Sequence, residues 1–469
     1  MKQFILKVAW RLAIPVAALV CNFTSCVSDS KKEEVKHDPN KPIVLTSYEP
    51  SHGRIRDMVL LDGSNFGTDI SAIKVFFNAA EAKVVGSTGT RILALVPRLP
   101  GDTCVVKVQI GNQEAKEYEE AFLYNISATV TTFAGNGATG FDLSKGLIDS
   151  ELTPVYLGVD SEFNIFVSIN TRRGGGNDAL LALIDPKNNT IRELCDQLTH
   201  GYIQRCHPNI NMRTDVVMLG AENMRNNFIF LDPKENWAPR QKFIKSWTNN
   251  EFTPPLGGSN GVNHSETHNQ VVAAIIDGKE WIYTRYSAGH IVKIDPETWV
   301  ATIIGMTPTG GSWGGGLHPK RQNEFWFAYQ QDQAGEYRNS ICMVDLADET
   351  YDPETKILTS FKQLSMSGNS HRDGPLNQAI FGNLRGINFD PEGNLYVGDN
   401  SNHCIRMIKT DVDPMMVSTI VGIPGVSGYQ NGNADEALFD SPHGLVSDEE
   451  GAVYVSDFNN NRIRRIAVE

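Results

Sequence analysis

Short apolar stretches separated by glycine-containing turns run through the chain from residue 41 onward. Within residues 41–126 these stretches are 58–61, 73–77, 92–96 and 104–110. Each stretch has the length of a β-strand, and turn residues follow each one. The pattern predicts a small β-sandwich for this part of the chain.

Several motifs in the same segment are more specific than the strand pattern. Tyr48-Glu-Pro-Ser-His-Gly53 precedes the first of these stretches, and Gly63-x-Asn65-Phe66-Gly67 follows it. With these motifs the segment resembles the IPT/TIG family of immunoglobulin-like domains, which implies a spacer or interaction module. Gly63 and Gly67 permit turn conformations closed to other residues, and Phe66 is expected to plug one end of the sandwich.

Residues 128–469 contain an internal repeat that is clearest near the C-terminus. Residues 373–381, 384–400 and 402–408 match residues 431–439, 442–458 and 460–466 at one constant offset. These units resemble NHL repeats, and the resemblance implies β-propeller blades of four antiparallel strands. Gly386 and Gly444 are expected to lie in the innermost strands, where glycine allows neighbouring backbones to approach closely. Asp399 and Asp457 end the next strand, where we expect them to accept hydrogen bonds from the backbone.

Weaker copies of the repeat predict four further blades. Their central strands are expected at 163–170 with 180–186, 216–219 with 228–233, 281–286 with 291–296, and 325–329 with 341–345. Residues 129–134 are similar to residues 416–422, the fourth strand of the fifth predicted blade, so we expect them to complete the sixth. The predicted fold class is all-β, with an immunoglobulin-like β-sandwich at 41–126 and a six-bladed β-propeller at 128–469.

Composition narrows the range of partners. Hydrophobic residues make up 41% of the chain, which is enough for large cores, and the formal net charge is −13. A strongly acidic chain would not replace counterions on a phosphate backbone, so we expect no nucleic acid partner. The charge is compatible with neutral or polar ligands and with basic partners.

The N-terminus carries a targeting signal. Lys2, Lys7 and Arg11 precede an apolar run at 12–20 that is too short to span a bilayer and contains Pro15. Phe23-Thr-Ser-Cys26 resembles the lipobox of bacterial lipoproteins, which implies a signal peptide at 1–25 and lipidation of Cys26. Cys21 is the alternative site, and a plain secretory signal is the alternative reading. Residues 26–40 are predicted to form a flexible acidic tether, so that the lipid is the chain's contact with the outer membrane.

Five cysteines follow Cys26, at positions 104, 195, 206, 342 and 404, and their spacing matches no zinc motif. Cys195 and Cys206 are close enough along the chain to form a disulfide, and buried free thiols are the alternative. We therefore predict no metal and no cofactor.

Candidate ligand contacts follow from the repeat register. Arg385 and His443 precede the innermost-strand glycines and are expected at the channel mouth, and Gly315 is aligned with them, which places Trp313 nearby. Trp313 is expected either to stack on a sugar ring or to pack between blades. The predicted ligand-binding residues are Trp313, His443, Arg385, His318, Tyr286 and Tyr329; no catalytic residues are predicted.

Three functions remain open at this stage. The architecture resembles surface glycan-binding lipoproteins of Bacteroidetes, which implies a polysaccharide or oligosaccharide ligand and an outer-membrane transporter complex as partner. A protein-binding scaffold is the second alternative. The third is a metal-dependent lyase or hydrolase, for which His264, Glu266, His268, His318 and His443 are the residues that could converge. We expect a binding protein and not an enzyme, because no complete catalytic set can be assembled.

Overall fold

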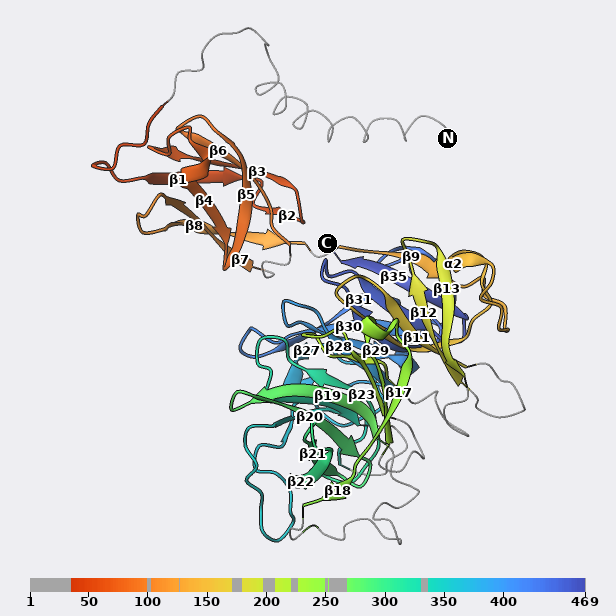
Figure 1. The fold of residues 1–469 in the computed structure, drawn as a ribbon. Coiled ribbons are helices and arrows are strands. Elements are labelled where there is room, and N and C mark those ends of the chain that lie inside the picture. The colour runs from red at the N-terminus through yellow and green to blue at the C-terminus, as the bar shows by residue number, and fades with distance from the viewer. Residues whose placement is uncertain are drawn as a thin grey trace. The chain divides into compact units, whose positions relative to one another are not determined.

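The structure is a computed structural model that describes residues 35–98, 103–125, 127–170, 179–196, 207–220, 227–248, 252, 268–329 and 336–468. The chain divides into two compact units between Asn125 and Ile126. The described part of the first unit is a β-sandwich and that of the second a β-propeller, so the predicted all-β fold class is confirmed (Figure 1).

The β-sandwich is built from strands with alternating buried and exposed positions. Its strands are paired in the order β1 (Val44–Glu49), β3 (Met58–Ser64), β6 (Arg91–Leu95), β5 (Ala80–Ser87), β4 (Ile73–Phe77), β7 (Thr103–Ile110), β8 (Lys116–Tyr124) and β2 (His52–Gly53), with the short helix η1 at Ile70–Ala72. Phe66 is buried, as predicted, and a Cβ on Gly63 would lie 2.4 Å from the Phe66 ring. Gly63 is therefore required for Phe66 to pack here.

Part of the predicted tether contacts this sandwich. The Asp38 amide donates to the Asn65 side chain at 2.8 Å, and the Thr68 amide donates to the Val35 carbonyl at 2.8 Å. The tether prediction therefore extends too far, because residues 35–40 are held by the turn around Asn65. Residues 26–34, the signal peptide and Cys26 lie outside the described residues.

The described residues of the second unit form six sheets, the blades of a β-propeller (Figure 1), and the space between their innermost strands is the central channel. Blade 1 contains β10 (Pro154–Val159), β11 (Ile165–Asn170), β12 (Ala179–Asp185) and β13 (Thr190–Asp196). Blade 2 contains β14 (Asn209–Ile210), β15 (Val217–Gly220), β16 (Asn227–Leu231) and β17 (Pro239–Phe243). Blade 3 contains β19 (His268–Ile276), β20 (Lys279–Tyr286), β21 (His290–Ile294) and β22 (Val300–Met306), with β18 (Ser246–Trp247) beside β22. Blade 4 contains β23 (Ser312–Leu317), β24 (Glu324–Tyr329), β25 (Ile341–Asp345) and β26 (Lys362–Gln363). Blade 5 contains β28 (Leu384–Phe389), β29 (Leu395–Asp399), β30 (Cys404–Lys409) and β31 (Met416–Val421), with β27 (Gly374–Pro375) beside β31. Blade 6 contains β33 (Pro442–Ser447), β34 (Val453–Asp457), β35 (Arg462–Val468) and β9 (Ala128–Ala134), with β32 (Gly432–Asn433) beside β9. Short helices are α2 (Gly146–Asp149), η4 (Pro233–Glu235), η5 (Leu376–Gln378) and η6 (Asn400–Asn402).

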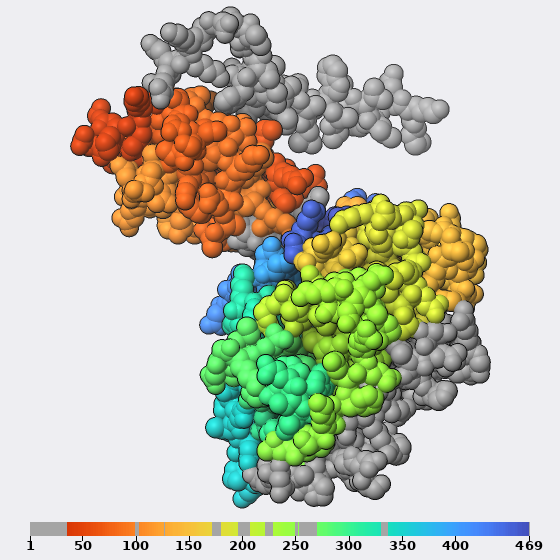
Figure 2. All heavy atoms as spheres, viewed as in Figure 1, coloured from red at the N-terminus to blue at the C-terminus, as the bar shows by residue number. Residues whose placement is uncertain are grey.

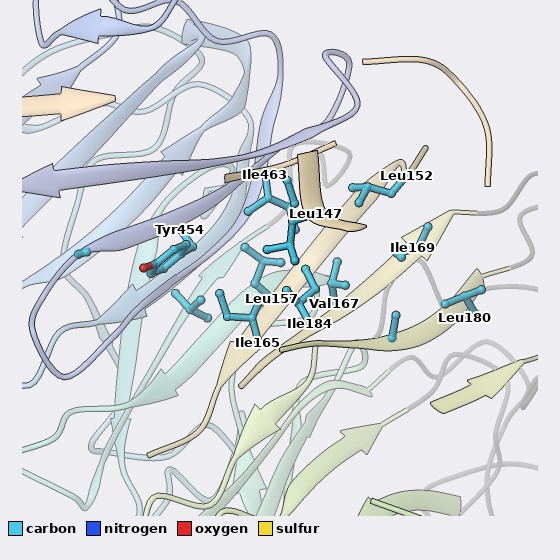
Figure 3. Close-up of a cluster of buried hydrophobic side chains, with 14 residues drawn as sticks. Leu147, Leu152, Leu157, Ile165, Val167, Ile169, Leu180, Ile184, Tyr454 and Ile463 are labelled. Carbon is cyan, nitrogen blue, oxygen red and sulfur yellow. The ribbon is translucent and has the colours of Figure 1, made fainter. Parts of the chain in front are cut away.

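Closure of the ring is as predicted. Strand β9 pairs antiparallel with β35, with Val130 opposite Ile466, and the two strands lie side by side in Figure 1. A buried apolar cluster then joins blade 6 to blade 1, with Ile463 and Tyr454 from one side and Leu157 and Val167 from the other (Figure 3). In the space-filling view the yellow residues of blade 1 border the blue residues of blade 6 (Figure 2).

The innermost-strand glycines have the predicted role. A Cβ on Gly386 would lie 2.7 Å from the His443 carbonyl oxygen, and one on Gly444 would lie 2.6 Å from the Tyr156 Cα. These contacts are shorter than any side chain tolerates, so glycine is required where the innermost strands of adjacent blades meet.

The strand-end aspartates are structural, as predicted, and each is paired with an arginine. Asp399 accepts from the Gly382 amide at 2.9 Å and from Arg406 at 3.1 Å. Asp457 makes the equivalent bonds to the Asp440 amide and Arg464. Each pair ties a blade to the loop that enters it.

Candidate functional site: the central channel

A cavity of about 200 Å³ lies in the channel, between the second halves of the innermost strands. All six blades contribute to its wall through β10, β14, β19, β23, β28 and β33. The wall is mainly apolar, with Leu157, Ile210, Val271, Ile387 and Leu445 among its residues. A concave, mostly apolar site with a few polar groups is typical of small-ligand binding, and this one is smaller than the roughly 300–1,000 Å³ of drug-sized pockets.

Turns that join the first and second strands of the blades surround one end of this cavity, which we call the turn face. In blades 1, 5 and 6 an aspartate begins each turn: Asp160, Asp390 and Asp448. Each carboxylate accepts from the amide four residues later, at 2.7 Å, 2.8 Å and 2.8 Å respectively. These acids therefore stabilise the turns and give the turn face a negative charge.

His318 occupies the equivalent place in blade 4. Its Nδ1 accepts from the amides of Lys320 and Arg321, both at 3.2 Å, and its Nε2 lies 3.0 Å from the Thr410 hydroxyl. Burial, with a contribution from nearby Arg321, lowers the pKa of His318 to about 4. His318, also predicted as a ligand contact, lies at the opposite end of β23 from Trp313. The imidazole here replaces the turn aspartate of blades 1, 5 and 6.

Trp313, Arg385 and His443 lie together at the other end of the channel. Trp313 follows Ser312, which pairs with Tyr329, just as Arg385 follows Leu384, which pairs with Asp399. The predicted alignment of Gly315 with Arg385 is therefore wrong by two positions, and Trp313 itself is equivalent. Three consecutive glycines at 314–316 obscured the register.

Trp313 is buried and does not form an open platform. Its side chain is 6% exposed and packs on Val155 and Tyr156, which belong to the opposite blade. The Arg385 guanidinium lies 4.3 Å from the centroid of the Trp313 ring. We call Tyr156, Trp313 and Arg385 the aromatic plug, because they pack together at this end of the channel.

His207 was not predicted from the sequence, since blade 2 has diverged from the repeat. Its ring lies 3.5 Å from that of Tyr156 and is hydrogen-bonded to the main chain of Trp313. Burial lowers the pKa of His207 to about 3. His443 is partly buried, with its ring 4.2 Å from that of Phe458, and burial together with Arg385 lowers its pKa to about 3. Both imidazoles are therefore neutral at neutral pH.

Tyr286 and Tyr329 were expected to add aromatic surface to the channel mouth, and this is wrong. Tyr286 is 0% exposed and Tyr329 is 1% exposed, because both rings pack in the cores between blades. The Tyr329 hydroxyl donates to the Pro308 carbonyl at 2.6 Å and accepts from Arg285 at 3.1 Å.

Arg285 is a second residue that sequence reasoning missed. It is 1% exposed, and it donates to the Thr307 hydroxyl at 2.8 Å, to the Gly310 carbonyl at 2.8 Å and to the Pro308 carbonyl at 3.0 Å. These bonds hold the segment that leads into Trp313. Arg285 therefore positions the aromatic plug from the neighbouring blade.

Some predicted residues lie outside the description. His264, Glu266 and Cys206 are not among the described residues, so the two alternatives for Cys195 stay open. His268 begins β19, and nothing is described of its side chain. Within the described ranges no group of three or more His, Cys, Asp or Glu residues could hold a metal ion, and no helix is long and apolar enough to cross a membrane.

Stability should fall as the pH drops below 6.5, because the unfolded chain binds protons that the buried His207 cannot. Because the pKa of His207 is lower in the folded protein than in the unfolded chain, its contribution to stability is fully present above the unfolded pKa of 6.5. That contribution is lost as the pH falls from 6.5 toward the folded pKa of about 3. Replacing His207 with glutamine should reduce this pH dependence by about 1.4 kcal/mol per pH unit between pH 6.5 and 4. Urea unfolding at several pH values would measure it.

The variant His52→Gln serves as the control, because His52 is exposed on the sandwich. Burial raises the pKa of Asp457, which opposes the histidine effect in the same pH range, so the difference between variant and wild type is the quantity to compare. Identical slopes for His207→Gln and wild type would contradict the burial of a neutral imidazole.

Comparison with known proteins places these observations in context. Residues 42–124 match the IPT/TIG domain, and residues 439–466 match the NHL repeat, which confirms both predicted resemblances. A protein of unknown function from Bacteroides thetaiotaomicron has the same fold, with 22% identity, a TM-score of 0.66, and coverage of 92% of this chain and 100% of that one. An auxiliary nutrient binding protein from Bacteroides thetaiotaomicron is 25% identical over 92% of this chain and 99% of its own, with a TM-score of 0.54.

Two further similarities differ in extent, one along nearly the whole chain and one along a short segment. An auxiliary nutrient binding protein from Bacteroides ovatus shares the fold at 20% identity, with a TM-score of 0.52 and coverage of 92% of this chain and 100% of that one. SUPPRESSOR OF QUENCHING 1, a chloroplastic protein of Arabidopsis thaliana, is 36% identical over 75 residues. The match spans 16% of this chain and 7% of the length of that protein.

Proposed function

We propose that the protein is a surface lipoprotein of the outer membrane that binds a polysaccharide or oligosaccharide in its propeller channel. The observation that carries this proposal is the cavity, whose wall is built by all six blades. The similarity along nearly the whole chain to an auxiliary nutrient binding protein supports a ligand-binding role. On this proposal the sandwich presents the propeller to nutrients, and an outer-membrane transporter complex receives the ligand.

The proposed role is binding and not catalysis. The acids and the histidine of the turn face are engaged in turn hydrogen bonds. Such groups are held in place for the fold and are poorly suited to exchange protons with a substrate. A metal assay on the purified chain tests this point: stoichiometric bound calcium or zinc would favour the metal-dependent lyase or hydrolase instead.

Replacing Gly316 with leucine should abolish ligand binding without unfolding the propeller. Gly316 lines the cavity, and a Cβ at this position would meet no atom within 4 Å. The leucine would therefore fill the space that the ligand needs. Binding of the chain from residue 27 onward to soluble α- and β-glucans, mannan, xylan and galacturonan would be measured by affinity electrophoresis and calorimetry.

Gly86→Leu is the matched control, since Gly86 lies in the sandwich and also has open space around its missing Cβ. This variant should bind as the wild type does. Unchanged binding by Gly316→Leu would exclude the cavity as the site. Absence of binding to every carbohydrate would overturn the proposal and favour the protein-binding scaffold.

Replacing Cys26 with serine should move the protein from the membrane fraction to the soluble fraction of a Bacteroides host. Without the thiol no lipid can be attached, and the apolar run at 12–20 is too short to hold the chain in a bilayer. Fractionation with radiolabelled palmitate would measure both location and lipid. Cys21→Ser is the control, and loss of the label in that variant alone would reassign the lipidation site.

A further inference from the structure

We propose that His207 and Asn209 hydrogen-bond directly to an uncharged hydroxylated ligand, such as a terminal sugar unit, which enters the cavity from the turn face. This inference rests on the proposed function and deepens it, because it names the contacting residues, the direction of entry and the ligand class.

The direction of entry follows from the aromatic plug. Trp313 reaches from blade 4 to Val155 and Tyr156 of blade 1, and Arg385 covers its ring. Tyr156 in turn lies against the His207 ring at 3.5 Å. His207 lines the cavity, whereas Trp313 and Arg385 do not, so the plug lies beyond its inner end. The turn face, with Met212 72% exposed beside the cavity, is the end that is left for a ligand.

Two polar groups in the cavity wall have no partner among the described residues. His207 is 7% exposed, and its Nε2 is buried without a hydrogen bond there. The Nδ2 of Asn209 is likewise buried without a hydrogen bond. The two residues are two positions apart, with His207 just before β14 and Asn209 at its start, and both line the cavity. Buried polar groups without partners are costly, by about 1–3 kcal/mol each, so such a pair in a cavity wall indicates a ligand that supplies the partners.

The chemistry of the pair selects a hydroxyl group. The Asn209 amide nitrogen can only donate, so the ligand must present an acceptor. The His207 ring already donates to the Trp313 main chain, so the free Nε2 of the neutral imidazole is an acceptor and the ligand must present a donor to it. One sugar hydroxyl, or two adjacent ones, therefore satisfies both residues, whereas a carboxylate satisfies only Asn209 and an ammonium group satisfies only His207.

Charge at the turn face excludes anionic ligands as well. Asp160, Asp390 and Asp448 line the cavity toward this end, and Arg213 is paired with Glu280 at 2.5 Å. An acidic sugar would have to pass these carboxylates with little compensating positive charge. The apolar wall beyond them suits the carbon faces of a neutral sugar ring.

The test compares the variants His207→Leu and Asn209→Leu with the wild type by calorimetry. The probes are neutral gluco-, manno- and xylo-oligosaccharides, oligogalacturonate as the anionic probe, and chitosan oligosaccharide as the cationic one. Each variant should bind the best neutral probe about tenfold more weakly, the cost of one buried hydrogen bond. The charged probes should bind the wild type at least tenfold more weakly than the best neutral one. His207→Gln, which keeps a donor and an acceptor, should lose less affinity than His207→Leu.

His52→Leu and Asn112→Leu, at exposed positions of the sandwich, are the matched controls, and circular dichroism checks that every variant is folded. Neutral binding that is lost in Gly316→Leu but unchanged in both His207→Leu and Asn209→Leu would overturn this inference and leave the proposed function standing. Preference of the wild type for a charged probe would overturn the ligand class. Failure of the wild type to bind any carbohydrate would overturn the proposed function itself.

Discussion

Replacing Arg464 with methionine is expected to lower the free energy of unfolding by about 3–5 kcal/mol, the cost of leaving a buried charge without its partner. Arg464 and Asp457 are both 0% exposed, and their side chains are 2.7 Å apart. The guanidinium also donates to the carbonyls of Leu438 at 3.0 Å and Gln430 at 2.6 Å. Methionine has a similar length but supplies none of these donors. Guanidinium chloride unfolding followed by circular dichroism would measure the change.

Two companion variants isolate the charge effect. Arg465→Met removes a neighbouring arginine that is only partly buried, and it should cost less than about 1 kcal/mol. Adding Asp457→Asn to Arg464→Met should recover part of the loss, because an amide is neutral. The loss should also be larger at pH 8 than at pH 5, since burial raises the pKa of Asp457 and acid allows it to become neutral. A loss below about 1 kcal/mol for Arg464→Met would show that the pair contributes little.

Replacing Thr131 with proline should destabilise the propeller by about 2 kcal/mol or more, by weakening ring closure. Thr131 is exposed and lies opposite Arg465 in the β9–β35 pair. Its side chain contributes no buried contact, so the loss would come from the backbone. Proline lacks an amide hydrogen and is tolerated only at sheet edges, whereas β9 lies between β32 and β35. Thermal unfolding of the whole chain would measure the change.

Thr131→Val is the control, since valine favours strands and keeps the backbone amide. It should leave the unfolding midpoint within a few degrees of the wild type. Equal stability of the proline and valine variants would mean that β9 is dispensable for holding the ring.

The fold could be predicted because the clear repeats contain glycines and aspartates at positions that the propeller blade requires. Gly386 and Gly444 mark where backbones meet, and Asp399 and Asp457 mark where strands end, so two clear copies sufficed to locate the weaker ones. The similarity of residues 129–134 to the fourth strand of blade 5 then identified the closing strand.

The candidate site could be predicted only in part. Arg385 and His443 were placed correctly at one end of the channel, but sequence cannot show that Trp313 crosses the channel and fills it. His318 was predicted to contact a ligand, but it takes the place of the aspartate that stabilises the equivalent turn in blade 5. This equivalence is visible only when the turns of the structure are compared. His207 and Asn209 belong to the most divergent blade, where no repeat motif points to them.

Closure by β9 also constrains when the propeller can finish folding. Arg462, beside the closing pair, bonds to the Asn136 carbonyl across 326 positions of sequence. During synthesis β35 is made long after β9, so the ring cannot close before β35 is available. Contacts of such long range also slow folding, because a large loop must be ordered before they form. The propeller is therefore expected to stay open, with the apolar edges of blades 1 and 6 uncovered, until β35 has been synthesised.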